Sequence, residues 1–170
     1  MNFTACFKPL LFCCLFSLSL PAQQRAFQTF PDLEYRIGQH FPIEEYKDED
    51  GNNFSPDALL GKKTLINFWS TTCAPCIKEL PYLNQMKERA GNKANFIAIT
   101  YEPKAKAAAF LKNHLFAFRH ITDAEKQLKT YFSILRNPMN FILDKKGNIQ
   151  EITGVADASK MEMIAGILNE

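Results

Sequence analysis

The sequence predicts an α/β fold built around a mixed β-sheet. Strand-like apolar segments alternate with helix-like segments, and the chain closes with a hairpin followed by a helix. With 170 residues, of which 46% are hydrophobic and 22% charged, the chain can form one domain with a substantial core. The net charge of +2, with basic residues not gathered into one stripe, argues against a nucleic-acid partner.

The first 22 residues have the pattern of a secretory signal peptide. Lys8 precedes an apolar run from Leu10 to Leu20, and cleavage is expected after Ala22. The run is short for a membrane span, although its weakly charged start leaves an uncleaved anchor as the alternative. An exported, periplasmic or otherwise extracytoplasmic protein is therefore predicted.

Residues 23–36 are expected to form a leader or linker, and residues 37–170 the folded domain. Turn signals at Asp50-Gly51 and Asn52-Asn53 predict an N-terminal β-hairpin extension. The expected helices and helical turns are 55–61, 74–90, 103–115, 123–132 and 158–168. The expected strands are 64–69, 95–101 and 116–122, together with a hairpin in 139–155. Gly91 is the expected stop of the helix over 74–90, and Asp123 the expected N-cap of the helix that follows it.

Signal cleavage would leave only two cysteines in the mature chain. Cys73 and Cys76 are three residues apart, so a disulfide between them closes almost no loop and stabilises the fold little. Export would place the pair where disulfides form and persist. A reversible, chemically active disulfide is the interpretation that this pattern favours.

The position of the pair suggests what each thiol does. Cys73 falls where a strand ends and a helix begins, and the unpaired N–H groups and dipole of a helix N-terminus favour a thiolate there. The pKa of such a thiol can fall from about 8.5 to between roughly 3.5 and 7.5. Cys76 lies one turn deeper on the same face, and Pro75 occupies the first turn, where its missing N–H costs little. Cys73 is the candidate attacking thiol and Cys76 the candidate resolving thiol.

Other chemistries for the pair find less support. A zinc site needs four ligands, and His40, His114 and His120 have no ligand-like spacing. Haem attachment would need His where the chain has Ile77. A thiol peroxidase-like redoxin remains an alternative, because the residues before Cys73 loosely resemble the Thr-x-x-Cys site of such enzymes. That motif normally opens with a proline, however, and this chain has Ile66 in its place. No metal or cofactor is expected.

Two motifs together identify a family. The first is F-W-x-x-x-C-x-P-C-x-x-E-x-P, ending at Pro81, and the second is x-P-x-x-F-x-x-D-x-x-G, which begins at Asn137. In these residues the chain resembles the thioredoxin superfamily, and more narrowly the exported TlpA/ResA-like thiol–disulfide oxidoreductases. The likeness runs from about Ile37 to the C-terminus. It implies a thioredoxin-like fold, with helices on both faces of the sheet.

The resemblance assigns roles by position. Cys73 and Cys76 match the redox pair, and Pro138 matches a proline that follows a cis peptide bond beside it. The backbone of Asn137 would then face the pair and bind an extended substrate, with Thr72 and Pro75 as further contacts. Pro81 matches a kink in the active-site helix.

Glu79 is the third candidate catalytic residue. It lies three residues beyond Cys76, on the same helical face. Thioredoxins carry a buried Asp where this chain has Asn67, and an amide cannot take a proton as a carboxylate can. Glu79 is expected to take that role with a pKa raised by partial burial, the alternative being an ordinary solvated carboxylate. Thr72 stands where relatives commonly have an aromatic residue, and Trp69 is expected to be a core residue.

The predicted function is thiol–disulfide exchange with exported client proteins, such as apocytochrome c, whose disulfides the chain would reduce. A membrane thiol transporter is the implied electron donor, and a monomer is expected. Besides the peroxidase, two alternatives remain from the residues: an oxidant that forms disulfides, which differs in reduction potential, and a non-enzymatic binding module of the same fold.

Overall fold

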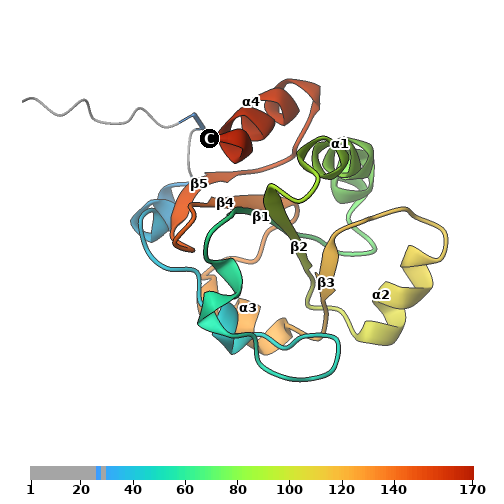
Figure 1. Ribbon diagram of the computed structural model, residues 1–170. Coiled ribbons are helices and arrows are strands. Elements are labelled where there is room, and N and C mark those ends of the chain that lie inside the picture. The colour runs from blue at the N-terminus through green and yellow to red at the C-terminus, as the bar shows by residue number, and fades with distance from the viewer. Residues whose placement is uncertain (1–25, 28–29) are drawn as a thin grey trace, which may run out of the picture.

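A five-stranded mixed sheet forms the centre of the molecule in the computed structural model, which describes residues 26–27 and 30–170 (Figure 1). The strand order is β3-β2-β1-β4-β5; β1, β2 and β3 run parallel, whereas β4 is antiparallel to β1 and β5 to β4. The strands are β1 (Lys63–Phe68), β2 (Ala94–Ile99), β3 (Arg119–Ile121), β4 (Met139–Leu143) and β5 (Ile149–Thr153). The mixed sheet confirms the predicted fold class.

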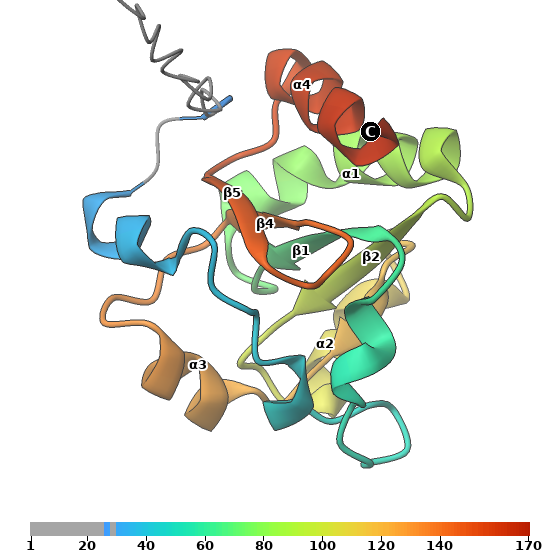
Figure 2. The same ribbon diagram turned by 60° about the vertical axis from the view of Figure 1, so that its left-hand side comes forward.

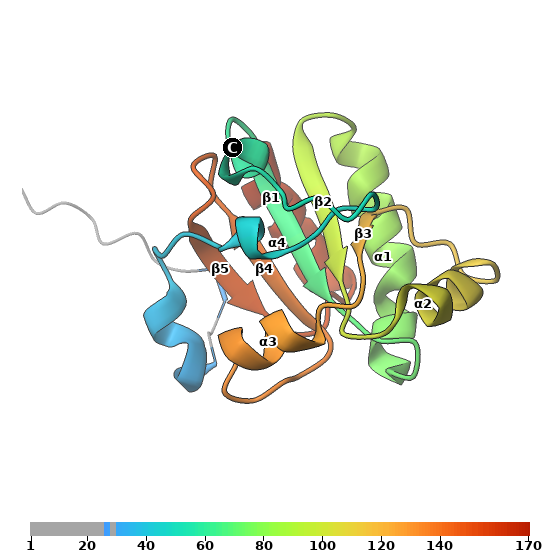
Figure 3. The ribbon, with the colours of Figure 1, turned by 90° about the horizontal axis from the view of Figure 1, so that it is seen from below.

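Helices lie on both faces of this sheet. They are α1 (Ala74–Ala90), α2 (Lys104–Leu111), α3 (Glu125–Tyr131) and α4 (Ala158–Asn169), with short 3-10 helices η1 (Pro31–Arg36), η2 (Ile43–Glu45) and η3 (Pro56–Leu59). Helices α1 and α4 lie side by side over one face (Figure 2). Seen from below, α3 lies in front of the sheet and α4 behind it (Figure 3). No helix in the described part of the chain is long and apolar enough to cross a bilayer.

Strand alternation divides the core into two clusters. Successive side chains of a strand point to opposite faces, so Leu65 packs under α1 and α4 while Ile66 packs on the other side. The first cluster contains Trp69, the predicted core residue, which is 1% exposed. The second contains Phe41 and Phe68, each of which meets the ring of Phe141 edge to face. The sheet is thus buried on both faces.

Helix α1 has the predicted bounds because its ends carry strong local signals. Cys73 is the N-cap residue, and its sulfur accepts the backbone N–H of Cys76. Gly91 ends the helix with a φ of 53°, a left-handed conformation that glycine adopts readily. Pro81 lies inside the helix, and the kink that the resemblance implies there stays a prediction.

Two N-terminal expectations differ from the structure. The hairpin is present only as an isolated antiparallel bridge between Lys47 and Asn53, and the short 3-10 helix η2 lies directly before that bridge. The predicted leader is not a free linker over residues 30–36, since Leu33 is buried in the core and Arg36 donates to the carbonyl of Tyr131. The expected signal peptide lies outside the described residues.

Asp123 does not cap α3. Ala124 is the N-cap residue of that helix and offers no side-chain cap, whereas Asp123 has a φ of 58°. Its carboxylate instead accepts the first backbone N–H of α2, from Lys104, at 3.1 Å. Asp123 is thus a helix-capping residue, as predicted, but it caps α2, which lies 19 residues earlier in the sequence, and not α3.

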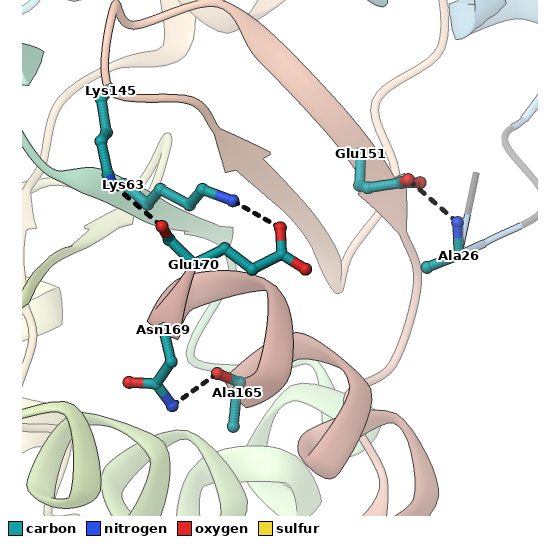
Figure 4. Close-up of polar contacts among 7 residues, drawn as sticks. All are labelled: Ala26, Lys63, Lys145, Glu151, Ala165, Asn169 and Glu170. Atoms are coloured by element: carbon teal, nitrogen blue, oxygen red, sulfur yellow. Dashed lines mark hydrogen bonds and ion pairs between the residues drawn. The ribbon is translucent and has the colours of Figure 1, made fainter. Parts of the chain in front are cut away.

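The end of α4 is fixed to the opposite end of the sheet from Cys73. Lys63, the first residue of β1, forms an ion pair with Glu170 at 3.0 Å, and Lys145 donates to the backbone oxygen of Glu170 (Figure 4). Glu151 on β5 accepts the N–H of Ala26 nearby. The two contacts of Glu170 hold the end of α4 to the sheet, and the chain leading into α4 supplies part of the site described below.

Candidate functional site

The two cysteines lie where β1 leads into α1. After Phe68 the chain makes a turn at Thr71 and Thr72, and Cys73 then begins the helix. Cys73 and Cys76 are joined by a disulfide, with their Cα atoms 5.2 Å apart. Cys73 is partly exposed, whereas Cys76 is 1% exposed. Cys73 is therefore open to a sulfur from outside and Cys76 is not; the attacking and resolving roles of the two thiols stay predictions.

The start of α1 stabilises negative charge on the outer sulfur. The Sγ atom of Cys73 accepts the N–H of Cys76 at 3.2 Å, so one of the unpaired donors of the first helical turn already faces it. Pro75 contributes no N–H at a position that has no helical partner. Once the disulfide is reduced, the same N–H and the helix dipole favour the Cys73 thiolate.

The predicted proline lies at the same end of the sheet. The Asn137–Pro138 peptide bond is cis, as the resemblance implies. Pro138 precedes Met139, which pairs with Phe68 at the end of β1, so the proline flanks the segment that leads to Cys73. Pro138 is buried and Asn137 is partly exposed. The roles of Asn137, Pro138, Thr72 and Pro75 in substrate binding stay predictions.

Glu79 is almost completely buried below the pair, with 1% exposure. Its Oε1 accepts the side-chain N–H of Asn67 at 2.7 Å, and its Oε2 accepts the backbone N–H of Ala156 at 2.7 Å. Burial raises the pKa of Glu79 to about 7, against the lowering effect of these donors, the nearby Asn140 amide and the charge of Lys160. Glu79 is not a solvated surface carboxylate, and it can gain or lose a proton near neutral pH.

Two asparagines extend this contact across the sheet. Asn67 on β1 lies opposite Asn140 on β4, and its side-chain nitrogen donates to the Asn140 oxygen at 2.9 Å. Asn140 in turn donates to the carbonyl of Gly154 at 2.8 Å. The sequence analysis named Asn67 but not Asn140. A lone amide inside an otherwise apolar strand, as in "MNFIL", is the signal that could have found it.

A second buried carboxylate holds the turn before Cys73. Glu102 follows β2 and is 2% exposed; it accepts the backbone N–H of Thr71 at 2.7 Å and the hydroxyl of the same residue at 2.9 Å. Lys106 forms an ion pair with it at 2.6 Å. Although burial acts in the opposite direction, these donors lower the pKa of Glu102, which is thus a carboxylate at neutral pH. Sequence reasoning missed this residue.

Other polar groups lie apart from the pair. Among the described residues, no three His, Cys, Asp or Glu side chains gather as metal ligands would. His120 packs against Trp69 and Phe116, and His114 stacks on Phe110. A cavity of about 490 Å³ is lined by the 46–51 loop, α2 and the segment after β3, and none of the site residues above lines it.

Comparison with known proteins places this geometry in a family. The model of the AhpC/TSA family matches residues 37–152. Over 143 residues the chain is 31% identical to the thioredoxin-like protein YneN of Bacillus subtilis, covering 81% of this chain and 83% of that one. It is 30% identical over 129 residues to the thiol-disulfide oxidoreductase ResA of Bacillus thuringiensis, covering 74% and 75% of the two chains.

A solved structure supports the fold. StoA from Bacillus subtilis superposes with a TM-score of 0.58 at 23% identity, over 74% of this chain and 94% of that one. The matched family model spans the redox pair, Glu79 and the cis proline. The chain therefore belongs to the AhpC/TSA family, and it is a thioredoxin-like thiol–disulfide oxidoreductase of the ResA type with Cys73 and Cys76 as its CxxC pair.

Proposed function

We propose that this chain reduces disulfides in exported client proteins, apocytochromes c among them, outside the cytoplasm. The observation that carries the proposal is the buried Glu79 carboxyl, three residues beyond Cys76, which can take up the proton of the inner thiol near neutral pH. The signal-like first 22 residues and the relatives named ResA support it.

The first step is attack by the exposed sulfur. The Cys73 thiolate attacks one sulfur of a client disulfide, that S–S bond breaks, and the released client thiolate takes a proton from water. The product is a mixed disulfide between Cys73 and the client. The edge around Cys73 suits an extended protein substrate, because Thr72 and Pro75 are exposed and Ile134 and Leu135 are exposed shortly before Pro138.

The second step is resolution by the inner sulfur. Glu79 takes the proton of Cys76, and the new thiolate attacks the sulfur of Cys73. The mixed disulfide breaks, the client sulfur leaves as a thiolate that takes a proton from water, and the Cys73–Cys76 disulfide forms. Glu79 keeps the proton of Cys76 and returns it to that thiol when the disulfide is reduced again. Two electrons pass from the chain to the client. A membrane thiol transporter would return them, so that the chain needs neither a metal nor an organic cofactor.

The deciding measurement is the reduction potential of the pair. The full chain would carry Cys6→Ser, Cys13→Ser and Cys14→Ser, so that only Cys73 and Cys76 titrate. Fluorescence of Trp69, the single tryptophan, follows equilibration with a dithiothreitol series, and the same chain with Cys73→Ser is the control.

Each outcome of this titration separates the candidate functions. A potential of about −250 mV or lower supports a reductant that depends on an electron donor. A value near about −120 mV means a disulfide-forming oxidant. Absence of a reversible two-electron transition leaves the binding module, and rapid oxidation of Cys73 by hydrogen peroxide with dithiothreitol-driven turnover would favour the peroxidase.

A further inference from the structure

A chain of buried amides connects Glu79 to the end of β5. The Asn140 nitrogen donates to the Gly154 carbonyl, the Asn140 oxygen accepts from the Asn67 nitrogen, and the same nitrogen donates to Glu79. Asn67 and Asn140 are 0% exposed and Glu79 is 1% exposed, so water does not compete for these bonds. The three donor–acceptor distances lie between 2.7 and 2.9 Å.

The direction of this chain is set at Gly154. A backbone carbonyl can only accept, so it requires that Asn140 present its NH₂ group there and its oxygen toward Asn67. That oxygen in turn requires the NH₂ group of Asn67, which then has its second hydrogen directed at Glu79. The orientation has a cost, because the oxygen of Asn67 is left buried without a partner.

This orientation matters for the form in which Glu79 is held. In the observed orientation, the Asn67 nitrogen donates to one oxygen of Glu79 and the N–H of Ala156 donates to the other. Two donors favour the carboxylate form of Glu79 over the protonated form. If the Asn67 amide turned over, its oxygen would face Glu79 and favour the protonated acid. The Asn67 oxygen, which now has no partner, would then accept a hydrogen bond from the protonated Glu79. Another residue must therefore hold the Asn67 side chain in its observed orientation.

We propose that Asn140 is a positioning residue for proton transfer between Cys76 and Glu79, and that it acts by holding the Asn67 amide in the orientation that donates to Glu79. The inference rests on the proposed role of Glu79. The remaining charged group that acts on Glu79 is Lys160 on α4, whose ammonium group donates to the Val155 carbonyl and does not contact the amide chain. Asn140 is thus the constraint that the Asn67 orientation requires.

The test follows the rate of the resolving step against pH. The full chain with the three serine substitutions is reduced and mixed with an aromatic disulfide, 5,5′-dithiobis(2-nitrobenzoate), in a stopped-flow instrument. Attack by Cys73 releases the first coloured thiolate, and resolution by Cys76 releases the second. The second rate, measured from pH 5 to 9.5, reports deprotonation of Cys76 through Glu79.

Asn140→Leu is expected to move the midpoint of this profile upward by roughly one to two pH units, because Asn67 can then turn its oxygen toward Glu79. Below the midpoint, the second rate falls about tenfold or more, while the first rate is unchanged. Asn140→Val removes the same bonds with a strand-favouring side chain, and it replaces the leucine variant if that variant does not fold.

A matched control is Asn95→Leu. Asn95 also reaches β1 from a neighbouring strand, where it donates to the Thr64 hydroxyl at 3.2 Å, but it does not touch the site. For this variant, the midpoint of the second rate against pH should stay at the wild-type value. A merely structural role for Asn140 would lower stability and leave the midpoint unchanged, as the control does, and would overturn the proposal.

Two further variants locate any failure. In an Asn67→Leu background, Asn140→Leu should add much less than its shift in the wild-type background, because only the direct effect of the nearby Asn140 amide on Glu79 then remains. An additional shift of the same size would mean that Asn140 does not act through Asn67, and would overturn the proposal. Glu79→Gln should remove the step near neutral pH and leave only the direct ionisation of the Cys76 thiol at higher pH. If the step survives that change, the proposed role of Glu79 is wrong whatever Asn140 does.

Discussion

Asn67 supplies one of the two N–H groups that contact the buried carboxyl of Glu79. Asn67→Asp places a second carboxyl group within hydrogen-bond distance of Glu79, and two adjacent buried carboxyls cannot both ionise readily. We expect the free energy of unfolding of the oxidised protein to fall by about 2–3 kcal/mol at pH 8, and by less at pH 5, where the pair can share a proton. Urea denaturation at the two pH values measures this.

The comparison needs a control for a new charge alone. Asn95→Asp adds a carboxylate to the neighbouring strand, at a partly exposed position without an acidic neighbour in its hydrogen-bond contacts. It should lower stability less at pH 8, and with weaker pH dependence. An equal loss for Asn67→Asp at pH 5 and pH 8 would show that the two carboxyls are not coupled.

Residues of the site differ in how far the sequence reveals them. Cys73, Cys76 and Glu79 are visible because they lie within seven residues of each other on one helix, where spacing alone predicts a shared face. Asn140 and Glu102 are not visible in this way. Their partners Asn67 and Thr71 are 73 and 31 residues away in sequence, and only the β1–β4 and β1–β2 pairings bring them together.

At the scale of elements, Glu102 connects the segment after β2 to the turn between β1 and α1. Glu102→Gln replaces an acceptor by a group that presents N–H toward the donors of Thr71, and it removes the ion pair with Lys106. We expect a loss of about 1–3 kcal/mol in the free energy of unfolding at pH 7 and a slower first step at Cys73. Denaturation and the first phase of the aromatic disulfide reaction measure the two effects.

Lys106→Met distinguishes the two kinds of contact at Glu102. It removes only the ion pair of a lysine whose side chain is 52% exposed, and it should cost less than about 1 kcal/mol. The stability that Glu102 contributes as a carboxylate is present above the pKa of the unfolded chain, and it is lost as the pH falls through the lowered folded pKa. Equal losses for both variants would mean that the bonds to Thr71 do not hold the turn.

Element boundaries were predictable where local signals fix both ends. Helix α1 begins and ends as predicted because Cys73 and Gly91 supply the two caps. The N-terminal region was not predictable in this way. Its turn residues indicate that the chain reverses direction, but they do not show whether strands flank the turn. Likewise, the sequence around Asp123 could not reveal that its carboxylate would cap α2 rather than α3.

At the scale of the whole molecule, the buried carboxyl of Glu79 should make the fold less stable as the pH rises. Burial raises the pKa of Glu79 to about 7, from 4.5 in the unfolded chain. Between these values the folded state binds more protons than the unfolded state, so the free energy of unfolding decreases with increasing pH. The full shift corresponds to about 3 kcal/mol between pH 4 and pH 8.

Glu79→Gln isolates this contribution in the oxidised protein, in which neither Cys73 nor Cys76 can titrate. The amide lacks the proton equilibrium, and any loss from its altered hydrogen bonds is independent of pH. Relative to wild type, the variant should therefore gain about 3 kcal/mol of stability from pH 4 to pH 8, measured by urea denaturation. A constant difference across this range would mean that Glu79 titrates at its ordinary pKa in the folded protein, and it could not then exchange a proton with Cys76 near neutral pH.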